Sequence, residues 1–169
     1  MKAHRKMRFV FAMKLQDYLV VGMGRVARDH TVSLVLHDTE MFGELIGLIQ
    51  SGSKTQRMKG SWVLSGVGAI NPHSLRPHYA CLLECLELET VGGVKRELLR
   101  CFDGIALDKL FADQLIMVAM NWVTDERQDL AVRYICFRLL TQLLKEYPEL
   151  QIELNQQIDF YRSKFGKFP

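Results

Sequence analysis

The chain has few residues that interrupt helices and no long run of apolar residues. Only four of its 169 residues are proline, which favours helices because proline inside a helix removes a hydrogen bond and clashes with the preceding turn. The longest apolar stretches, residues 18–24, 62–70 and 115–123, are well short of the roughly 18 residues expected of a membrane-spanning helix. We therefore predict a soluble, all-α protein.

The sequence also lacks the motifs that mark common cofactor-binding and active sites. It contains no Gly-x-Ser-x-Gly, no His-Glu-x-x-His and no phosphate-binding glycine loop. Active sites can be built from residues scattered along a chain, so an enzyme stays a less favoured alternative. We predict a protein with no catalytic residues, no cofactor and no bound metal.

None of the four cysteines belongs to a Cys-x-x-Cys pair. Cys81, Cys85, Cys101 and Cys136 lie in apolar surroundings, which indicates small core residues in a reducing compartment, and we expect a cytoplasmic protein. His78, Cys81 and Cys85 recur at i, i+3 and i+7, so these zinc-binding residue types share one helix face. One straight helix cannot surround a tetrahedral ion, however, and we interpret this face as part of the core.

The net charge of +3 is unevenly distributed. Five of the 22 basic side chains and none of the 19 acidic ones lie in residues 1–14, so residues 15–169 carry 17 basic and 19 acidic side chains, a net of −2. A strong nucleic-acid-binding protein would usually show a basic body. We predict a basic, solvated N-terminal arm over residues 1–14 and a single helical domain over residues 15–169. Met7 and Met13 leave open the alternative that translation starts downstream and that the arm is not part of the native chain. The apolar stretch within the arm is too short for a signal peptide.

One helical pattern recurs three times at a spacing of 36 to 38 residues. Repeats of this length are typical of stacked helical hairpins, each too small to bury its apolar face alone. The pattern therefore predicts an α-solenoid. Its copies are Met58-Lys59 followed by Trp62-Val63, Val94-Lys95 followed by Leu98-Leu99, and Val132-Arg133 followed by Cys136-Phe137.

Apolar spacing and turn residues divide the chain into expected helices. Glycine, serine and proline interrupt the spacing between them, and residues 124–126 supply N-cap chemistry. Leu98, Leu139 and Leu143 lie on apolar stripes and are expected in the core between repeats. The expected helices are near residues 14–36 (broken around 22–24), 39–51, 56–70, 74–89, 93–106, 108–123, 127–147 and 149–164, the last forming a polar cap.

These features resemble a HEAT-type repeat of the armadillo superfamily over roughly residues 39–164. The Val-Lys/Arg-x-x-apolar-apolar opening of each second helix is similar to the family's pattern, and residues 129–133 show it best. The resemblance implies that Lys59, Lys95 and Arg133 stack along an inner ridge in a structural role.

Two glycines lie within the helix expected at residues 56–70. Gly66 stands where the other copies have large apolar residues, and Gly68 follows it closely. Each lowers helix stability by up to about 1 kcal/mol relative to alanine. We therefore predict that a close contact with a neighbouring element compensates for them.

The predicted fold class is all-α, a right-handed solenoid of about three to four stacked antiparallel helix pairs. Solenoids present extended, rigid surfaces, and rigidity lowers the entropy lost on association. The predicted function is a non-catalytic scaffold that binds a protein partner through the ridge formed by the second helices. The residues predicted to contact that partner are Lys59, Lys95, Arg96, Arg100, Arg133 and Arg138.

A HEAT-like nucleic-acid-binding or DNA-base-repair protein is the alternative function. HEAT-like DNA glycosylases hold damaged DNA on a concave, basic face that contains tryptophan. Trp62, Trp122 and Tyr134 could stack bases in this way, while the basic residues of the second helices bind phosphates. Five acidic residues are interspersed among those basic residues, and a solvated face of mixed charge is the simpler interpretation. They are Glu84, Glu87, Glu89, Glu97 and Asp103.

Overall fold

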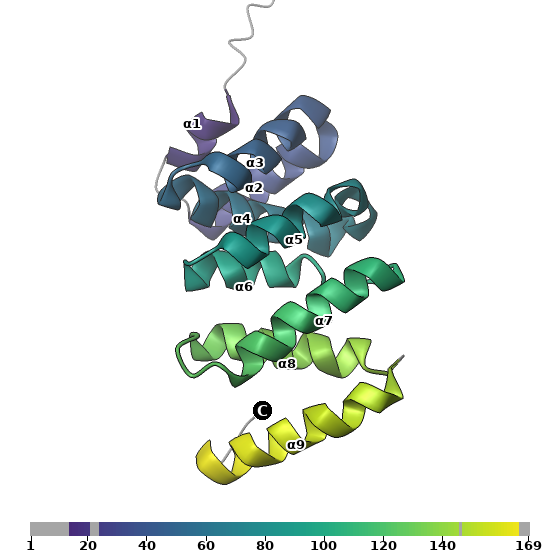
Figure 1. The fold of residues 1–169 in the computed structure, drawn as a ribbon. Helices are drawn as coiled ribbons and strands as arrows, with labels where there is room; N and C mark the ends of the chain where they lie inside the picture. The colour runs from purple at the N-terminus through teal and green to yellow at the C-terminus, as the bar shows by residue number, and fades with distance from the viewer. Residues whose placement is uncertain (1–13, 21–23, 146, 166–169) are drawn as a thin grey trace, which may run out of the picture.

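A computed structural model describes residues 14–20, 24–145 and 147–165. The predicted arm therefore lies almost entirely outside the described residues, and its separation from the rest stays a prediction. All regular structure in the described part is helical, stacked along one axis (Figure 1). The helices are α1 (Leu15–Val20), α2 (Arg25–His37), α3 (Thr39–Ser51), α4 (Lys54–Ile70), the 3₁₀ helix η1 (Pro72–His78), α5 (Tyr79–Leu88), α6 (Gly92–Arg100), α7 (Lys109–Thr124), α8 (Leu130–Leu143) and α9 (Pro148–Phe165).

The helices form two layers. In one layer α2 packs on α4, α4 on α6 and α6 on α8, and in the other α3 packs on α5 and α5 on α7. Short connections join the layers into the hairpins α3–α4, α5–α6 and α7–α8, with α2 before them and α9 after them (Figure 1). This arrangement confirms the predicted all-α solenoid of stacked helix pairs.

A continuous apolar core runs between the layers. Leu98 and Leu139 are buried as predicted, whereas Leu143 is half-buried at the edge of the core. The difference arises because α8 ends at Leu143, and Leu144 in the following turn takes the buried position instead. The apolar spacing of the second helices therefore locates the core, except in the last turn of α8.

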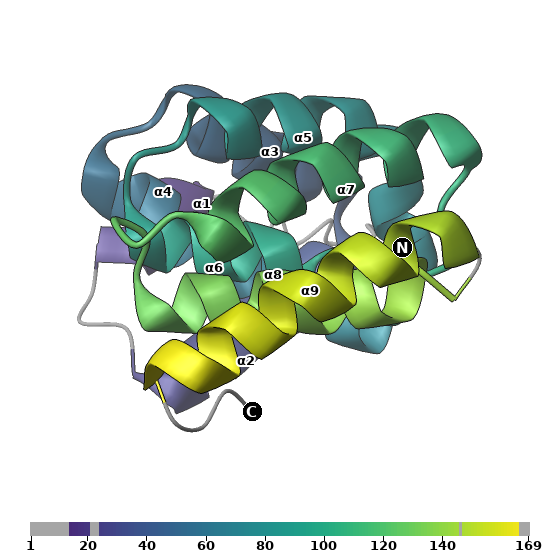
Figure 2. The same cartoon turned by 60° about the horizontal axis from the view of Figure 1, so that its bottom comes forward.

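The last helix closes the stack. Figures 1 and 2 both place α9 at the end of the array, beyond α8. Leu154 is buried and Leu150 packs against the core, while Glu153, Asn155 and Gln156 are exposed. The outer face of α9 is mostly polar, as predicted for a cap, although Ile152 is also exposed on this helix.

Two expected helices end or begin differently because of glycine and proline. The helix expected at 93–106 ends at Arg100, and the chain turns through Gly104, whose φ of 71° is left-handed; glycine adopts that conformation without steric penalty. The helix expected at 74–89 begins as the 3₁₀ helix η1, which contains Pro77. Proline removes a backbone donor and disfavours helical geometry at the residue before it, so the regular helix starts at Tyr79.

The ends of α4 and α7 also differ from expectation. α4 begins at Lys54 because Ser53 and Gln56 form a capping box around its first turn. α7 continues to Thr124, and the expected N-cap segment at 124–126 is a turn instead, in which the carboxylate of Asp125 accepts a hydrogen bond from the backbone N–H of Arg127 at 3.0 Å. Asp129 then precedes α8.

An ion pair ties α4 to the segment before α6. Arg57 donates to Glu89, with 2.9 Å between Nε and Oε2, and Glu89 also accepts from the backbone N–H groups of Thr90 and Val91. Burial by itself would raise the pKa of Glu89, but the hydrogen bonds from Arg57 and from the two amides outweigh it and lower that pKa. Glu89 is therefore held as a carboxylate inside the stack.

None of the helices in the described ranges is both long enough and apolar enough to cross a membrane.

Candidate functional site: an arginine groove on the concave face

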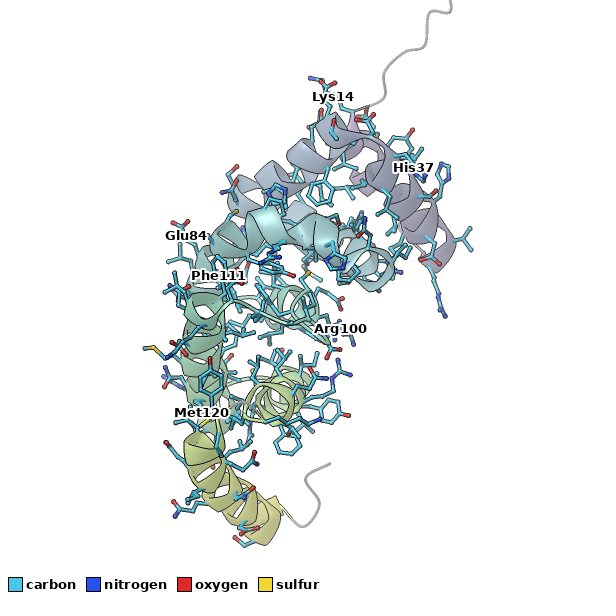
Figure 3. All side chains as sticks on the ribbon, turned by 90° about the vertical axis from the view of Figure 1, so that its right-hand side faces the viewer. Lys14, His37, Glu84, Arg100, Phe111 and Met120 are labelled. Atoms are coloured by element: carbon cyan, nitrogen blue, oxygen red, sulfur yellow. The ribbon has the colours of Figure 1, made fainter. Side chains whose placement is uncertain are left out.

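The stack is curved, and the second helices lie on its hollow side. Figure 3 shows Arg100 pointing into the concavity, whereas Glu84, Phe111 and Met120 lie on the opposite side with α5 and α7. The concave side is therefore lined by α2, α4, α6 and α8. This is the ridge of second helices from which the sequence predicts binding.

A groove of about 500 Å³ runs along this concave side. Four arginines line it, Arg25 and Arg28 from α2, Arg100 from α6 and Arg138 from α8, and we call it the arginine groove. Two acidic residues, Glu97 and Asp103, line it as well. Four cationic and two anionic side chains leave the groove with a net positive charge.

Glu97 organises the centre of the arginine groove. Its carboxylate is only 4% exposed and accepts hydrogen bonds from Ser65 Oγ at 2.7 Å, Arg96 Nε at 3.2 Å and Arg100 at 2.9 Å. A buried carboxylate is tolerated only when it is paired and hydrogen-bonded. Arg96 and Arg100 remain 41% and 46% exposed, so Glu97 fixes both guanidinium groups without removing them from the surface.

Arg28 is held at the other wall by Trp62 and by a glycine. Its Nε donates to the backbone carbonyl of Trp62 at 3.2 Å, and its guanidinium carbon lies 5.7 Å from the centre of the indole ring, within cation–π range. A Cβ on Gly66 would lie 2.5 Å from that guanidinium carbon. The predicted close contact at Gly66 is confirmed, and it makes room for a groove arginine. At Gly68 a Cβ would lie 2.7 Å from a methyl group of Leu75, which confirms the second contact.

Arg138 is positioned by the turn that follows α6. It pairs with the carboxylate of Asp103, which also accepts a hydrogen bond from the side-chain amide of Gln142 at 3.3 Å. Gln142 in turn accepts from the backbone N–H of Gly104 at 3.2 Å. The left-handed turn at Gly104 thus places an acid next to Arg138, which keeps 40% of its side chain exposed.

Two of the predicted partner-binding residues face inward. Lys95 and Arg133 are each 7% exposed. The ammonium nitrogen of Lys95 lies 4.3 Å from the centre of the Trp122 ring and donates to Gln128 at 2.8 Å, and Arg133 Nε donates to the carbonyl of Val123 at 3.2 Å. Lys95 therefore joins α6 to the end of α7 and the turn after it, and Arg133 joins α8 to the end of α7. These contacts agree with the structural role implied by the HEAT resemblance.

The remaining predicted residues divide between two neighbouring hollows. Arg100 and Arg138 line the arginine groove, and Lys59 and Arg96 line a smaller hollow beside it. Sequence reasoning missed Arg25 and Arg28, because α2 carries no copy of the repeated motif. The glycine at position 66 is the signal that could have indicated Arg28, since it marks where a large side chain approaches α4.

The aromatic residues considered for base stacking are not gathered in the groove. Trp62 lines it, but the Trp122 ring lies against the Lys95 ammonium, and Tyr134 is 39% exposed on α8. The groove therefore offers a single tryptophan, whose ring is already contacted by Arg28.

The cysteine and histidine face of η1 and α5 is engaged in packing. His78 stacks on Phe42 with 5.0 Å between ring centres. Burial raises the pKa of the Cys85 thiol to about 12, with Cys81 adding to the effect, and metal ligation requires the thiolate form. Among the residues that the structure describes, no three His, Cys, Asp or Glu side chains are placed so that they could hold a metal ion together.

Comparison with known families agrees with this architecture. A family model described as a HEAT repeat domain matches residues 16–167. The chain belongs to the HEAT repeat family. This match extends the resemblance seen in the motif back to α1 and α2. No curated protein and no solved structure matches the chain. HEAT repeats commonly serve as scaffolds for protein interactions and are generally non-catalytic.

Proposed function

We propose that this HEAT repeat protein is a non-catalytic scaffold that binds a segment of a protein partner in the arginine groove. The observation that carries the proposal is that arginines from α2, α6 and α8 meet on one concave face, where Arg25, Arg100 and Arg138 stay substantially exposed. Exposed arginines that the fold holds in place are suited to recognising carboxylates, because a guanidinium can donate two parallel hydrogen bonds to one.

The guanidinium groups are pre-organised but not saturated. Within the described part of the chain, Arg96 contacts Glu97 through Nε, and Arg100 does so through one terminal nitrogen. The other N–H groups of these two arginines are available to a ligand. Because Glu97 has already fixed both side chains, a partner would lose less side-chain entropy in binding them than in ordering free surface arginines.

The charge pattern favours a protein segment over nucleic acid. A nucleic acid backbone carries a negative charge at every phosphate, and some phosphates would have to lie near Glu97 and Asp103 in the same groove. Like charges a few ångströms apart repel each other. A protein segment can place carboxylates opposite the arginines and neutral residues opposite the two acids.

The test is a selection from a library of random peptides, about a dozen residues long, against the immobilised protein, followed by titration of the selected peptides. We expect acidic peptides, and we expect the double variant Arg100→Gln/Arg138→Gln to bind them at least about tenfold more weakly, since hydrogen bonds to charged groups contribute about 1.5–3 kcal/mol each before solvent screening. Glutamine removes the charge without placing a new anion beside Glu97 or Asp103.

The matched control is Lys54→Gln/Lys109→Gln, which removes the same charge from exposed first residues of α4 and α7 outside the groove. If both double variants lose affinity equally, the attraction is a non-specific effect of net charge and the groove is not the site. Labelled DNA and RNA titrated at two salt concentrations decide the remaining alternative. Tight, steeply salt-dependent binding lost in Arg100→Gln/Arg138→Gln would assign the groove to nucleic acid instead.

A further inference from the structure

An apolar hollow opens beside the arginine groove. It has a volume of about 230 Å³ and is lined by Met58, Lys59, Trp62, Gly93, Arg96 and Glu97. We call it the Trp62 hollow. Trp62 and Glu97 line both the hollow and the arginine groove, so the two are adjacent parts of one surface. Met58, on the apolar side of the hollow, is 44% exposed.

The Trp62 hollow exists because of the residue at position 93. In the three copies of the repeated motif, this position is occupied by Arg57, Gly93 and Ala131 in turn. A Cβ on Gly93 would lie 3.7 Å from the Met58 methyl group, which is ordinary van der Waals contact. A Cβ is therefore accommodated at this position, and we expect the longer side chain of Gly93→Leu to extend into the hollow.

The Trp62 hollow and the arginine groove offer two kinds of contact to one ligand. The indole of Trp62, the methionine and the glycine provide an apolar surface, while Arg96 lies at its edge and Arg100 beyond it, both fixed by Glu97. Successive residues of an extended peptide advance by about 3.3 Å. A side chain in the hollow would thus be followed, within a few residues, by side chains facing Arg100 and Arg138.

We infer that the partner segment carries one large apolar residue next to two or more acidic residues. The apolar side chain occupies the Trp62 hollow, and the carboxylates bind the guanidinium groups of Arg100 and Arg138. This inference rests on the proposed function and narrows it to one class of ligand. The occupant is a protein segment because Glu97 and Asp103 in the groove would repel a backbone charged at every phosphate, whereas a peptide can place neutral side chains opposite them.

The experiment uses three fluorescent peptides with the same glycine- and serine-rich flanks. The first contains a leucine followed by three acidic residues, the second replaces the leucine with serine, and the third replaces the acids with glutamine. We expect the protein to bind the leucine peptide at least about tenfold more tightly than the serine peptide, because only the leucine side chain gains free energy by leaving water for an apolar hollow. The glutamine peptide is expected to bind most weakly.

Gly93→Leu is the decisive variant, since it fills the Trp62 hollow and leaves every arginine in place. We expect it to bind the leucine and serine peptides with equal affinity, at the level the wild type shows for the serine peptide. Met58→Ser serves as a second variant at an exposed position, and it should reduce the preference for leucine without blocking the acidic peptides. Circular dichroism and thermal melting establish that each variant is folded.

The outcomes separate the inference from the proposed function. If the leucine and serine peptides bind the wild type equally, or if Gly93→Leu keeps the preference for leucine, the inference is wrong while the proposed function stands. If acidic and glutamine peptides bind equally, both are wrong. If the protein alone associates in sedimentation experiments and Gly93→Leu abolishes that association, the occupant is a second copy of this chain, which also overturns the inference.

Discussion

Replacing Gly66 with alanine tests the tight approach of α2 to α4 on which the position of Arg28 depends. In an exposed helix, glycine to alanine stabilises by roughly 0.5–1 kcal/mol. At this site, however, the new methyl carbon would lie 2.5 Å from the Arg28 guanidinium carbon and 2.8 Å from a methyl group of Val32, which is buried. Overpacking of this kind costs about 1–3 kcal/mol. The repulsion outweighs the gain in helix stability, and we expect a net destabilisation of about 1 kcal/mol.

Gly47→Ala is the matched control. Gly47 lies in the middle of α3, and in the described part of the chain nothing comes within 4 Å of a Cβ placed there. The same substitution should therefore stabilise the protein by about 0.5–1 kcal/mol. The two variants differ from the wild type by one methyl group each, yet their effects are expected to have opposite signs.

The assay is urea unfolding followed by circular dichroism at 222 nm, with the free energies compared at equal slopes of the transition. A second comparison in the Arg28→Ala background isolates the guanidinium contact, because removing that side chain should relieve part of the Gly66→Ala destabilisation. Stabilisation of similar size by Gly66→Ala and Gly47→Ala would refute the close approach. The explanation of Arg28 as a groove residue fixed by Gly66 would then also be wrong.

Two further predictions concern the core and the buried ion pair. Leu98→Ala and Leu139→Ala should each lower the free energy of unfolding by about 2–5 kcal/mol. Leu143→Ala, at a half-buried site, should lower it by clearly less. Equal losses for all three variants in urea unfolding would contradict the assignment of which face of α8 is buried. The lowered pKa of Glu89 means that its contribution to stability is fully present above its ordinary pKa of 4.5 and is lost as the pH falls through the lower, folded-state value. Glu89→Gln, which leaves Arg57 without its carboxylate, should be less stable than the wild type at pH 7, and the difference should shrink below pH 4.5; a difference that does not change with pH would show that the ion pair contributes nothing.

The fold could be predicted because each copy of the repeated motif packs against its neighbours in the same way. A spacing of 36 to 38 residues fixes which helices stack on one another, and apolar spacing fixes the face of each helix that is buried. Helix ends were less predictable where a single residue decides them. Gly104 and Pro77 set the end of α6 and the start of α5, and both lie inside apolar patterns that read as continuous helix.

The groove was predicted only in part, because neighbouring residues on a helix point in different directions. Lys95 aligns with the repeat and faces inward to Trp122, while the next residue, Arg96, faces the hollow. Successive side chains on a helix differ by about 100° in direction, so small errors in helix orientation exchange buried and exposed cations. Arg28 could not be assigned from α2 alone, because its position depends on Trp62 and Gly66 in α4, the helix that packs against α2.

The contacts that join adjacent repeats also determine how far apart the arginines of the groove lie. Arg57 to Glu89, Ser65 to Glu97 and Arg138 to Asp103 each span 32 to 35 residues, close to one repeat. Since each of these contacts joins adjacent repeats, the stack is a series of similar joints. Arg28 on α2 and Arg138 on α8 are separated by three such joints, and a small rotation at each adds up to a large change in the distance between them. A change at any one joint, even one that touches none of the arginines, would therefore alter the span of the arginine groove.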